Sequence, residues 1–221
     1  METALVIGSS GGIGTALSNA LTARGIAVTG LSRSRDGLDV TDEASVAAAL
    51  GALTGPFDLV FVATGALEIG GAEPEKTLRH VTGDAMIDQF KLNTVGPSLV
   101  LKHAMRLLPR KGRSVFAALS ARVGSIGDNR LGGWYSYRTS KAALNQMIHS
   151  GAIELARTHK DLICVALHPG TVETKFTEKY VGQNPSVPAS QAAANLLSVL
   201  EGLTPQDTGK FFDWQGKEVP W

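Results

Sequence analysis

Short apolar runs rich in Val, Ile and Leu alternate along the chain with longer stretches in which apolar residues recur at helical spacing. This alternation is typical of a parallel sheet whose strands are joined by crossover helices. The predicted strands are Ala4–Ile7, Ala27–Leu31, Leu38–Val40, Asp58–Ala63, Ser114–Leu119, Leu162–Leu167 and Lys210–Trp214. The predicted helices are Ile13–Arg24, Glu43–Leu53, Ala85–Leu108, Tyr135–Thr158 and Ala189–Leu203. We therefore expect an α/β fold, a doubly wound parallel sheet with helices on both faces.

The connections between these elements are short and rich in Pro, Gly and Ser, and no long linker separates two compositions. A chain of 221 residues with 43% apolar side chains can fill one core, so we expect residues 1–221 to form a single domain. The stretch 173–188 has no clear period and follows the end of a strand, where open α/β sheets bind ligands. We predict that this stretch is a substrate lid.

Charge and cysteine content argue against several classes of function. The chain has 21 Lys and Arg against 20 Asp and Glu, which is not the basic balance of a protein that binds nucleic acid or a membrane surface. No apolar stretch approaches a membrane span, and no basic segment precedes the first strand as in a signal peptide. Cys164 is the single cysteine, and no Cys/His cluster has zinc spacing. We expect a cytoplasmic protein without a metal.

A glycine-rich turn joins the first predicted strand to the first predicted helix. Such a turn lets the backbone approach a pyrophosphate, which the N–H groups of the helix N-terminus can bind. The spacing is GxxxGxG and differs from the GxGxxG dinucleotide fingerprint. Tight packing of a βα turn without a ligand is the alternative interpretation. The residues predicted to bind the dinucleotide here are Gly8, Ser10, Gly12, Ile13 and Gly14.

The end of the second predicted strand bears on the choice of dinucleotide. It carries Ser32 and Arg33 and no carboxylate that would accept a ribose 2′-hydroxyl, since the first acidic residue is Asp36. A charge-assisted hydrogen bond from Arg33 to a 2′-phosphate contributes roughly 1.5–3 kcal/mol, so NADP(H) is favoured over NAD(H). An ordinary solvated loop arginine is the alternative. Asp39, followed by Val40, is a candidate acceptor for the adenine amino group, or else forms an Asx turn.

Tyr137 and Lys141 lie four residues apart in Tyr-Arg-Thr-Ser-Lys, which places them on one face of the predicted helix. Such a pair is common by chance, but here it follows a strand of a sheet whose first turn is suited to a cofactor. With GSSGGIG at 8–14, YRTSK at 137–141 and PGTVET at 169–174, the chain resembles the short-chain dehydrogenase/reductase family, and within it the C-factor and carbonyl-reductase-like branch.

This resemblance implies a Rossmann-type fold and reversible hydride transfer between nicotinamide C4 and a carbonyl or alcohol carbon. It implies that Tyr137 is the general acid/base and that Lys141 binds the nicotinamide ribose and lowers the pKa of the tyrosine. A phenol titrates near pH ~10, and lowering its pKa by two to three units needs about 3–4 kcal/mol, more than the ~1 kcal/mol of an exposed ion pair. We therefore expect the pair to be partly desolvated.

Asn93 and Pro97 suggest a proton relay. Proline has no N–H, so the backbone carbonyl four residues earlier, that of Asn93, loses its helical partner and can hold a water in a kinked helix. The resemblance implies that the motif asparagine reaches the catalytic lysine through such a water. A helix that merely bends around the core is the alternative.

The serine and the third strand depart from the family pattern. The family commonly shows a Ser-Ser pair before the catalytic helix, whereas this chain has Ser120 followed by Ala121. We predict that Ser120 polarises the substrate carbonyl, although the register could place Ala121 there, with Ser125 as the fallback. After the third long strand, the turn with Ala63 and Gly65 is predicted to run alongside the adenosine of the cofactor. Of these residues, only Gly65 matches the family motif.

The remaining predicted cofactor contacts follow the fifth long strand. Pro169 and Gly170 turn the chain there, and the resemblance implies that Val172 and Thr174 contact the nicotinamide carboxamide; a plain loop turn is the alternative. We expect an NADP(H)-dependent oxidoreductase of a small carbonyl or alcohol substrate, acting as a homodimer or homotetramer without nucleic acid or membrane partners. A nicotinamide-binding regulatory or signalling protein is the competing hypothesis.

Overall fold

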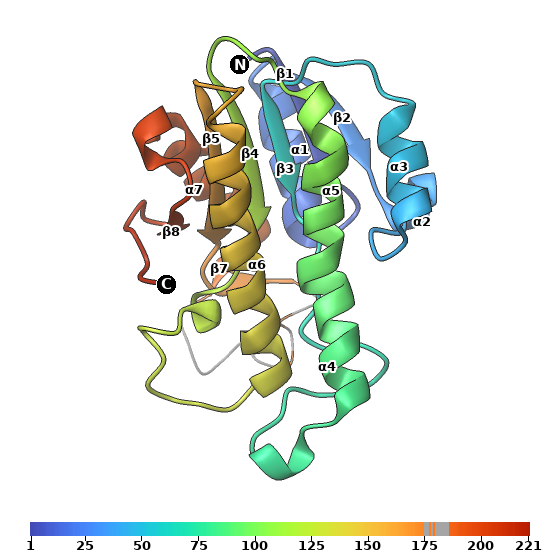
Figure 1. The fold of residues 1–221 in the computed structure, drawn as a ribbon, viewed down its shortest axis with the longest axis vertical. Helices are drawn as coiled ribbons and strands as arrows, with labels where there is room; N and C mark the ends of the chain where they lie inside the picture. The colour runs from blue at the N-terminus through green and yellow to red at the C-terminus, as the bar shows by residue number, and fades with distance from the viewer. Residues whose placement is uncertain (175–176, 178, 180–185) are drawn as a thin grey trace.

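The computed structural model describes residues 1–174, 177, 179 and 186–221. Its main sheet has six parallel strands in the order β2-β1-β3-β4-β5-β8 (Figure 1). Their bounds are β1 Thr3–Ile7, β2 Ala27–Leu31, β3 Leu59–Val62, β4 Ser114–Leu119, β5 Leu162–His168 and β8 Phe211–Asp213. A second, two-stranded sheet pairs β6 Val172–Glu173 with β7 Val187–Pro188. This architecture confirms the predicted α/β fold.

Helices cover both faces of the main sheet (Figure 1). On one face lie α3 Glu43–Gly51, α5 Gly96–Ala104 and α6 Tyr135–Leu155, whose apolar side chains share a core cluster with β1, β3, β4 and β5. On the other face lie α1 Gly12–Ala23 and α7 Ala189–Gly202. Alternate residues of β1, β3, β4 and β5 point to opposite faces of the sheet, and both sets are largely apolar because these strands are buried on both sides.

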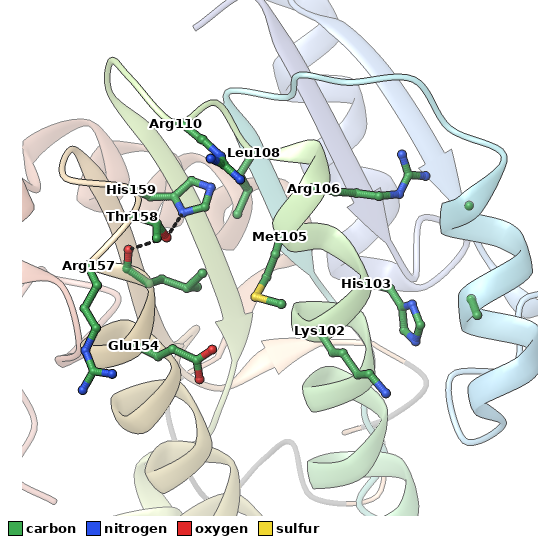
Figure 2. Close-up of a pocket in the computed structure, with 13 residues that line it drawn as sticks. Lys102, His103, Met105, Arg106, Leu108, Arg110, Glu154, Arg157, Thr158 and His159 are labelled. Atoms are coloured by element: carbon green, nitrogen blue, oxygen red, sulfur yellow. Dashed lines mark hydrogen bonds between the residues drawn. The ribbon is translucent and has the colours of Figure 1, made fainter.

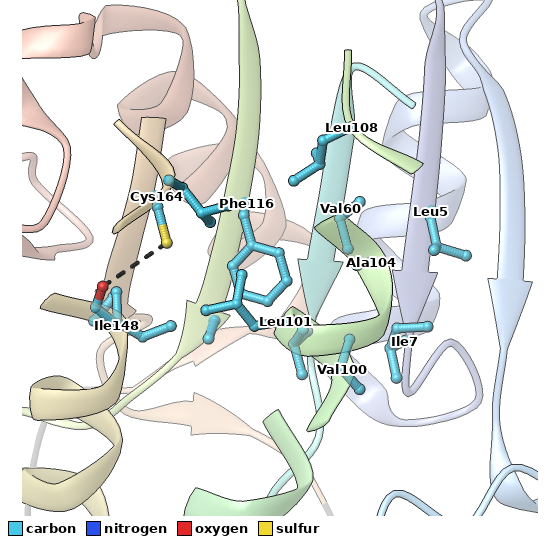
Figure 3. Close-up of a cluster of buried hydrophobic side chains, with 14 of the residues drawn as sticks. Leu5, Ile7, Val60, Val100, Leu101, Ala104, Leu108, Phe116, Ile148 and Cys164 are labelled. Carbon is cyan, nitrogen blue, oxygen red and sulfur yellow. Dashed lines mark hydrogen bonds between the residues drawn. The ribbon is translucent and has the colours of Figure 1, made fainter. Parts of the chain in front are cut away.

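One of the two core clusters lies between the sheet and the helices α3, α5 and α6. Figure 3 shows Phe116 of β4 surrounded by aliphatic side chains from the neighbouring strands and from these helices, all of them buried. Cys164 lies in this cluster with its thiol 3.9 Å from the carbonyl oxygen of Ile148. Burial raises the pKa of this thiol to about 12, so the cysteine acts as a small apolar side chain.

The predicted strand at Leu38–Val40 is wrong. The amide of Leu38 donates to the carbonyl of Ser32 and that of Asp39 to the hydroxyl of Ser45, so this backbone makes turn contacts instead of a strand ladder. Leu38 and Val40 are apolar because they are buried in the α3/α5 core. The sequence also gave no sign of the short helix α2 Arg33–Asp36, which Ser32 caps.

The predicted helix Ala85–Leu108 is interrupted. It consists of α4 Gly83–Phe90, a π-helical turn at Lys91–Val95, α5, and a 3-10 turn at Met105–Leu107. The π turn, in which the amide of Gly96 donates to the carbonyl of Lys91, lies just before Pro97 and explains the irregularity that the proline predicted. It directs the Asn93 side chain into the molecule, where it is fully buried.

The carboxyl ends of the parallel strands define one edge of the sheet. In Figure 1 they point to the lower half, where α4, the first turns of α6 and β7 lie. The turns that follow β1, β3, β4 and β5 therefore meet in one region. The predicted lid at 173–188 also begins there, but residues 175, 176, 178 and 180–185 of it lie outside the described residues.

Candidate active site

The glycine turn after β1 is tightly wound against the end of β3. Gly8 has φ +86°, a left-handed conformation that favours glycine, and a Cβ there would lie 3.0 Å from the backbone of Ala63. Within the described residues, the buried hydroxyl of Thr64 beside this turn has no hydrogen-bond partner. A buried polar atom at a glycine cradle fits a polar ligand that would hydrogen-bond to it.

Gly12 lies against a segment from a distant part of the sequence, which leaves no room for a side chain at this position. A Cβ on Gly12 would lie 2.6 Å from Cγ2 of Thr174, which belongs to the segment after β6. The structure thus brings the first predicted cofactor motif against Thr174 of the last one. Gly170, in the turn between β5 and β6, has φ +81°, and a Cβ there would lie 3.0 Å from Cδ1 of Trp214, so this turn favours glycine.

The residues predicted to select the dinucleotide lie beside the glycine turn. Arg33 is exposed at the start of α2, and the hydroxyl of Ser34 donates to that of Ser10 over 3.0 Å, which ties α2 to the turn. The hydroxyl of Ser32 is already used in capping, since it donates to Asp36 Oδ2 over 3.2 Å and accepts from the amide of Arg35. Two exposed cationic side chains of α2 lie beside the turn, the predicted Arg33 and also Arg35.

Asp39 forms the Asx turn that was its alternative interpretation. Its Oδ1 accepts from the amide of Thr41 over 2.9 Å and from the hydroxyl of Thr41 over 2.7 Å. These bonds, with a smaller contribution from Arg33, lower the pKa of the Asp39 carboxyl. The predicted contact of Asp39 with an adenine amino group would have to use its other carboxylate oxygen, Oδ2, and stays a prediction.

Tyr137 and Lys141 are buried together on one face of α6, with 7% and 3% of their surfaces exposed. The ammonium nitrogen of Lys141 lies 5.9 Å from the centre of the Tyr137 ring and donates a 2.9 Å hydrogen bond to the carbonyl of Leu119. Burial lowers the pKa of Lys141 to about 7 and raises the pKa of Tyr137. Desolvation by itself therefore keeps the phenol protonated, and lowering its pKa requires an added positive charge.

Asn93 and Lys141 meet at Gly65. A Cβ on Gly65 would lie 2.8 Å from Asn93 Oδ1 and 3.3 Å from the Lys141 nitrogen, and the φ of +151° also favours glycine. The amide of Asn93 binds both backbone groups of Ala66, donating to its carbonyl over 2.9 Å and accepting from its N–H over 3.1 Å. Asn93 thereby fixes the chain after β3 against the lysine; the relay through its backbone carbonyl stays a prediction.

Comparison with known proteins identifies the family. The profile of the short chain dehydrogenase family matches residues 2–185 of this chain. The chain belongs to that family. It is similar to 1-hydroxy-2-glutathionyl-2-methyl-3-butene dehydrogenase of Rhodococcus sp. (strain AD45), with 33% identity over 241 aligned positions and 100% of both proteins covered. It is also similar to the C-signal protein of Myxococcus xanthus, with 34% identity over 168 positions that cover 76% of this chain and 95% of that protein.

Among solved structures, the short chain dehydrogenase fold of this chain is similar to an NADPH-bound carbonyl reductase from chicken fatty liver. The TM-score is 0.82 and the identity 25%, with 100% of this chain and 94% of the reductase covered. These findings confirm the predicted family and an oxidoreductase acting on C=O and CH–OH groups. In the described part of the chain, no helix is long and apolar enough to cross a membrane, and no group of three His, Cys, Asp or Glu side chains could hold a metal.

The serine position is where the chain departs from the short chain dehydrogenase pattern. Ser120 is 4% exposed, and its hydroxyl donates to Asn145 Oδ1 over 2.6 Å, away from bulk solvent. To donate to a substrate it would have to leave Asn145. Ala121 follows on half-exposed, extended backbone, and the Ser125 hydroxyl is bound to the carbonyl of Pro220. The geometry leaves both the Ser120 and the Ala121 interpretations open.

A pocket of about 660 Å³ lies elsewhere, between the ends of α5 and α6 and the helix α3 (Figure 2). Its lining is rich in basic side chains and includes none of the predicted site residues. In Figure 2, Lys102, His103 and Arg106 extend toward α3, and Arg157 lies on the other side, at the end of α6. Tyr137 and Lys141, the predicted catalytic pair, are buried outside this pocket.

Several residues around the site were not predicted from the sequence. They are Thr64, Glu75, Gln89, Ser136 and Asn145, each of which contacts a predicted site residue or the backbone next to one. Thr64 directly follows the predicted strand Asp58–Ala63, so its place at the strand end was a usable signal. Gln89 lies four residues before Asn93 and Ser136 directly before Tyr137, so these two were also within reach of a local pattern. Glu75 and Asn145 act through contacts between distant segments, which no local pattern reveals.

Proposed function

We propose that this chain is an NADP(H)-dependent reductase or dehydrogenase that transfers hydride between the nicotinamide and a small carbonyl or alcohol substrate. The observation that carries the proposal is the desolvated pair of Tyr137 and Lys141 beside Gly65. A phenol and an ammonium buried on one helix face are suited to moving a proton at a substrate oxygen. The similarity to a carbonyl reductase described as NADPH-bound supports the choice of cofactor.

The residues that would hold the cofactor follow three strands, β1, β2 and β5. The glycine turn with Gly8, Gly12 and Gly14 offers the backbone N–H groups at the start of α1 to the pyrophosphate. Arg33 would bind the 2′-phosphate, and Val172 and Thr174 would bind the carboxamide. When bound, the dinucleotide supplies or accepts the hydride at its nicotinamide ring.

This chain's own residues supply the proton and hold the substrate. In the reductive direction, Tyr137 donates the proton of its hydroxyl to the carbonyl oxygen as the carbon receives the hydride, so that an alcohol forms. Lys141, whose pKa is about 7, is close to both its charged and its neutral form at working pH and can return a proton to the phenolate. Asn93 keeps the chain after β3 against the lysine.

The test is the substitution Tyr137→Phe. We expect turnover of any accepted aldehyde or ketone to fall by about 10³-fold or more, as for loss of a general acid, while the Kd for NADPH changes little because the ring is kept. Turnover is measured from NADPH absorbance and Kd by calorimetry. Unchanged turnover in the variant would refute the role of Tyr137.

A second candidate function is a nicotinamide-binding regulatory or signalling protein without required turnover. The similarity to the C-signal protein and the alanine at position 121 favour it. Purified protein that binds NADPH but oxidises none of it with a panel of aldehydes, ketones and quinones would support this function over the first.

We also propose that residues 1–221 fold as one domain and that the protein forms a homodimer or homotetramer. A single cooperative unfolding transition would support one domain. Light scattering coupled to gel filtration gives the mass in solution, and the mass of a monomer at micromolar concentration would rule out the proposed assembly.

A further inference from the structure

The helix that carries Tyr137 and Lys141 begins without a cap of its own. Its N-cap residue is Trp134, and an indole has no oxygen to accept the free N–H groups of a first helical turn. Trp134 also has φ +51°, a left-handed conformation that is strained for an aromatic residue. Its ring packs edge-on against Tyr137, with ring centres 6.3 Å apart. The geometry of Tyr137 therefore depends on how this helix start is held.

Glu75, from the loop after β3, provides the missing cap. Its Oε2 accepts the amide of Ser136 over 3.2 Å, and its Oε1 accepts the hydroxyl of Ser136. Its backbone carbonyl accepts the amide of Trp134 over 2.6 Å. Glu75 is 5% exposed and Ser136 is 2% exposed, so this carboxylate is nearly removed from water. A negative charge at this place also complements the positive end of the helix dipole.

The loop that carries Glu75 is anchored to the same site at its other end. Asn93 binds both backbone groups of Ala66, and the side chain of Gln89 donates to the carbonyl of Leu67 over 2.9 Å. Gln89 in turn accepts from Asn93 over 2.6 Å. The loop thus spans from the Asn93 side of the site to the start of α6, with fixed contacts at each end.

We infer that Glu75 is a positioning residue for the reaction. It caps α6 from a distant loop, and it thereby fixes the positions of Trp134 and Tyr137 relative to Asn93 and Gln89, which bind the other end of that loop. A buried carboxylate is costly unless it is fully hydrogen-bonded, and here its bonds are made to the first turn of the catalytic helix. The inference rests on the proposed function, because it assumes that Tyr137 acts on the substrate.

The experiment compares Glu75→Ala, Glu75→Gln and the control Glu73→Gln, which removes a charge from an exposed side chain of the same loop. Kinetics are measured at a temperature where circular dichroism shows every variant folded. For Glu75→Ala we expect kcat to fall about tenfold or more while KM and the Kd for NADPH stay within about threefold. Glutamine keeps an acceptor for the Ser136 amide, so we expect it to recover most of kcat, and the control to match the wild type.

Hydrogen exchange by mass spectrometry gives a readout that needs no turnover. We expect Glu75→Ala to speed exchange in the first turn of α6, with Glu75→Gln intermediate and later turns unchanged. Wild-type exchange in that turn, or wild-type kcat, in Glu75→Ala would overturn the inference. If Tyr137→Phe is inactive while Glu75→Ala is fully active, only the role of Glu75 falls; if Tyr137→Phe is fully active, the proposed function falls.

Discussion

The ammonium group of Lys141 is bound to the carbonyl of Leu119, 2.9 Å away at the last residue of β4. This bond joins the middle of α6 to the edge of the sheet where the strands end. It holds a buried cation in place before any ligand arrives, and burial lowers the pKa of that cation to about 7.

Lys141 should make the stability of the ligand-free protein depend on pH. Its pKa is about 7 when folded and near ~10.4 when unfolded, so between these values the unfolded chain binds the extra proton and stability rises with pH. We expect the free energy of unfolding of wild type to gain about 2 kcal/mol relative to Lys141→Met between pH 7 and pH 9. Urea titrations at several pH values measure this, and parallel profiles for the two proteins would contradict it.

Arg33 should distinguish the two dinucleotides. Arg33→Ala removes a charge-assisted bond of roughly 1.5–3 kcal/mol, so we expect the Kd for NADPH to rise by about 10- to 150-fold. The Kd for NADH, which has no 2′-phosphate, should change little. Lys111→Ala, an exposed substitution before β4, is the control. An equal loss for both dinucleotides would remove the argument for a 2′-phosphate site.

Gly12→Ala should weaken dinucleotide binding by displacing Thr174. The added Cβ would lie 2.6 Å from Thr174 Cγ2, and Thr174→Ser removes that carbon while keeping the hydroxyl. We expect the Kd for NADPH to rise about tenfold in Gly12→Ala and to recover in part in the double variant. Gly83→Ala, at the start of α4 with nothing within 4 Å, is the matched control. If the effects of Gly12→Ala and Thr174→Ser on the Kd for NADPH are simply additive in the double variant, this contact is not the cause of the weaker binding.

Ser120→Ala and Ala121→Ser together decide which residue faces the substrate. Because the Ser120 hydroxyl is bound to Asn145, we expect Ser120→Ala to lower the free energy of unfolding by about 1–3 kcal/mol and to reduce kcat less than tenfold. If Ala121 occupies the position that faces the carbonyl, Ala121→Ser raises kcat. A loss of ~3–4 kcal/mol in transition-state stabilisation in Ser120→Ala, with no gain in Ala121→Ser, would instead make Ser120 the carbonyl donor.

The sequence predicted the order of strands and helices because each buried strand has its own apolar run and each helix its own period. It misassigned Leu38–Val40, since burial under α3 and α5 produces the same apolar pattern as a strand. The positions of Tyr137 and Lys141 followed from a single helix period. The cap from Glu75 and the contact of Ser120 with Asn145 could not be predicted, because each joins segments far apart in the sequence whose separation in space depends on the whole sheet.

The meeting of Gly12 with Thr174 also bears on how the molecule acquires its binding site. One residue belongs to the first helix formed during synthesis, and the other follows the fifth strand. Pairings this distant in sequence are slow to form, because the intervening chain must first be ordered. A ribosome-bound fragment that ends before β5 would therefore carry the glycine turn but lack the wall opposite it, and affinity for a dinucleotide would emerge late in translation.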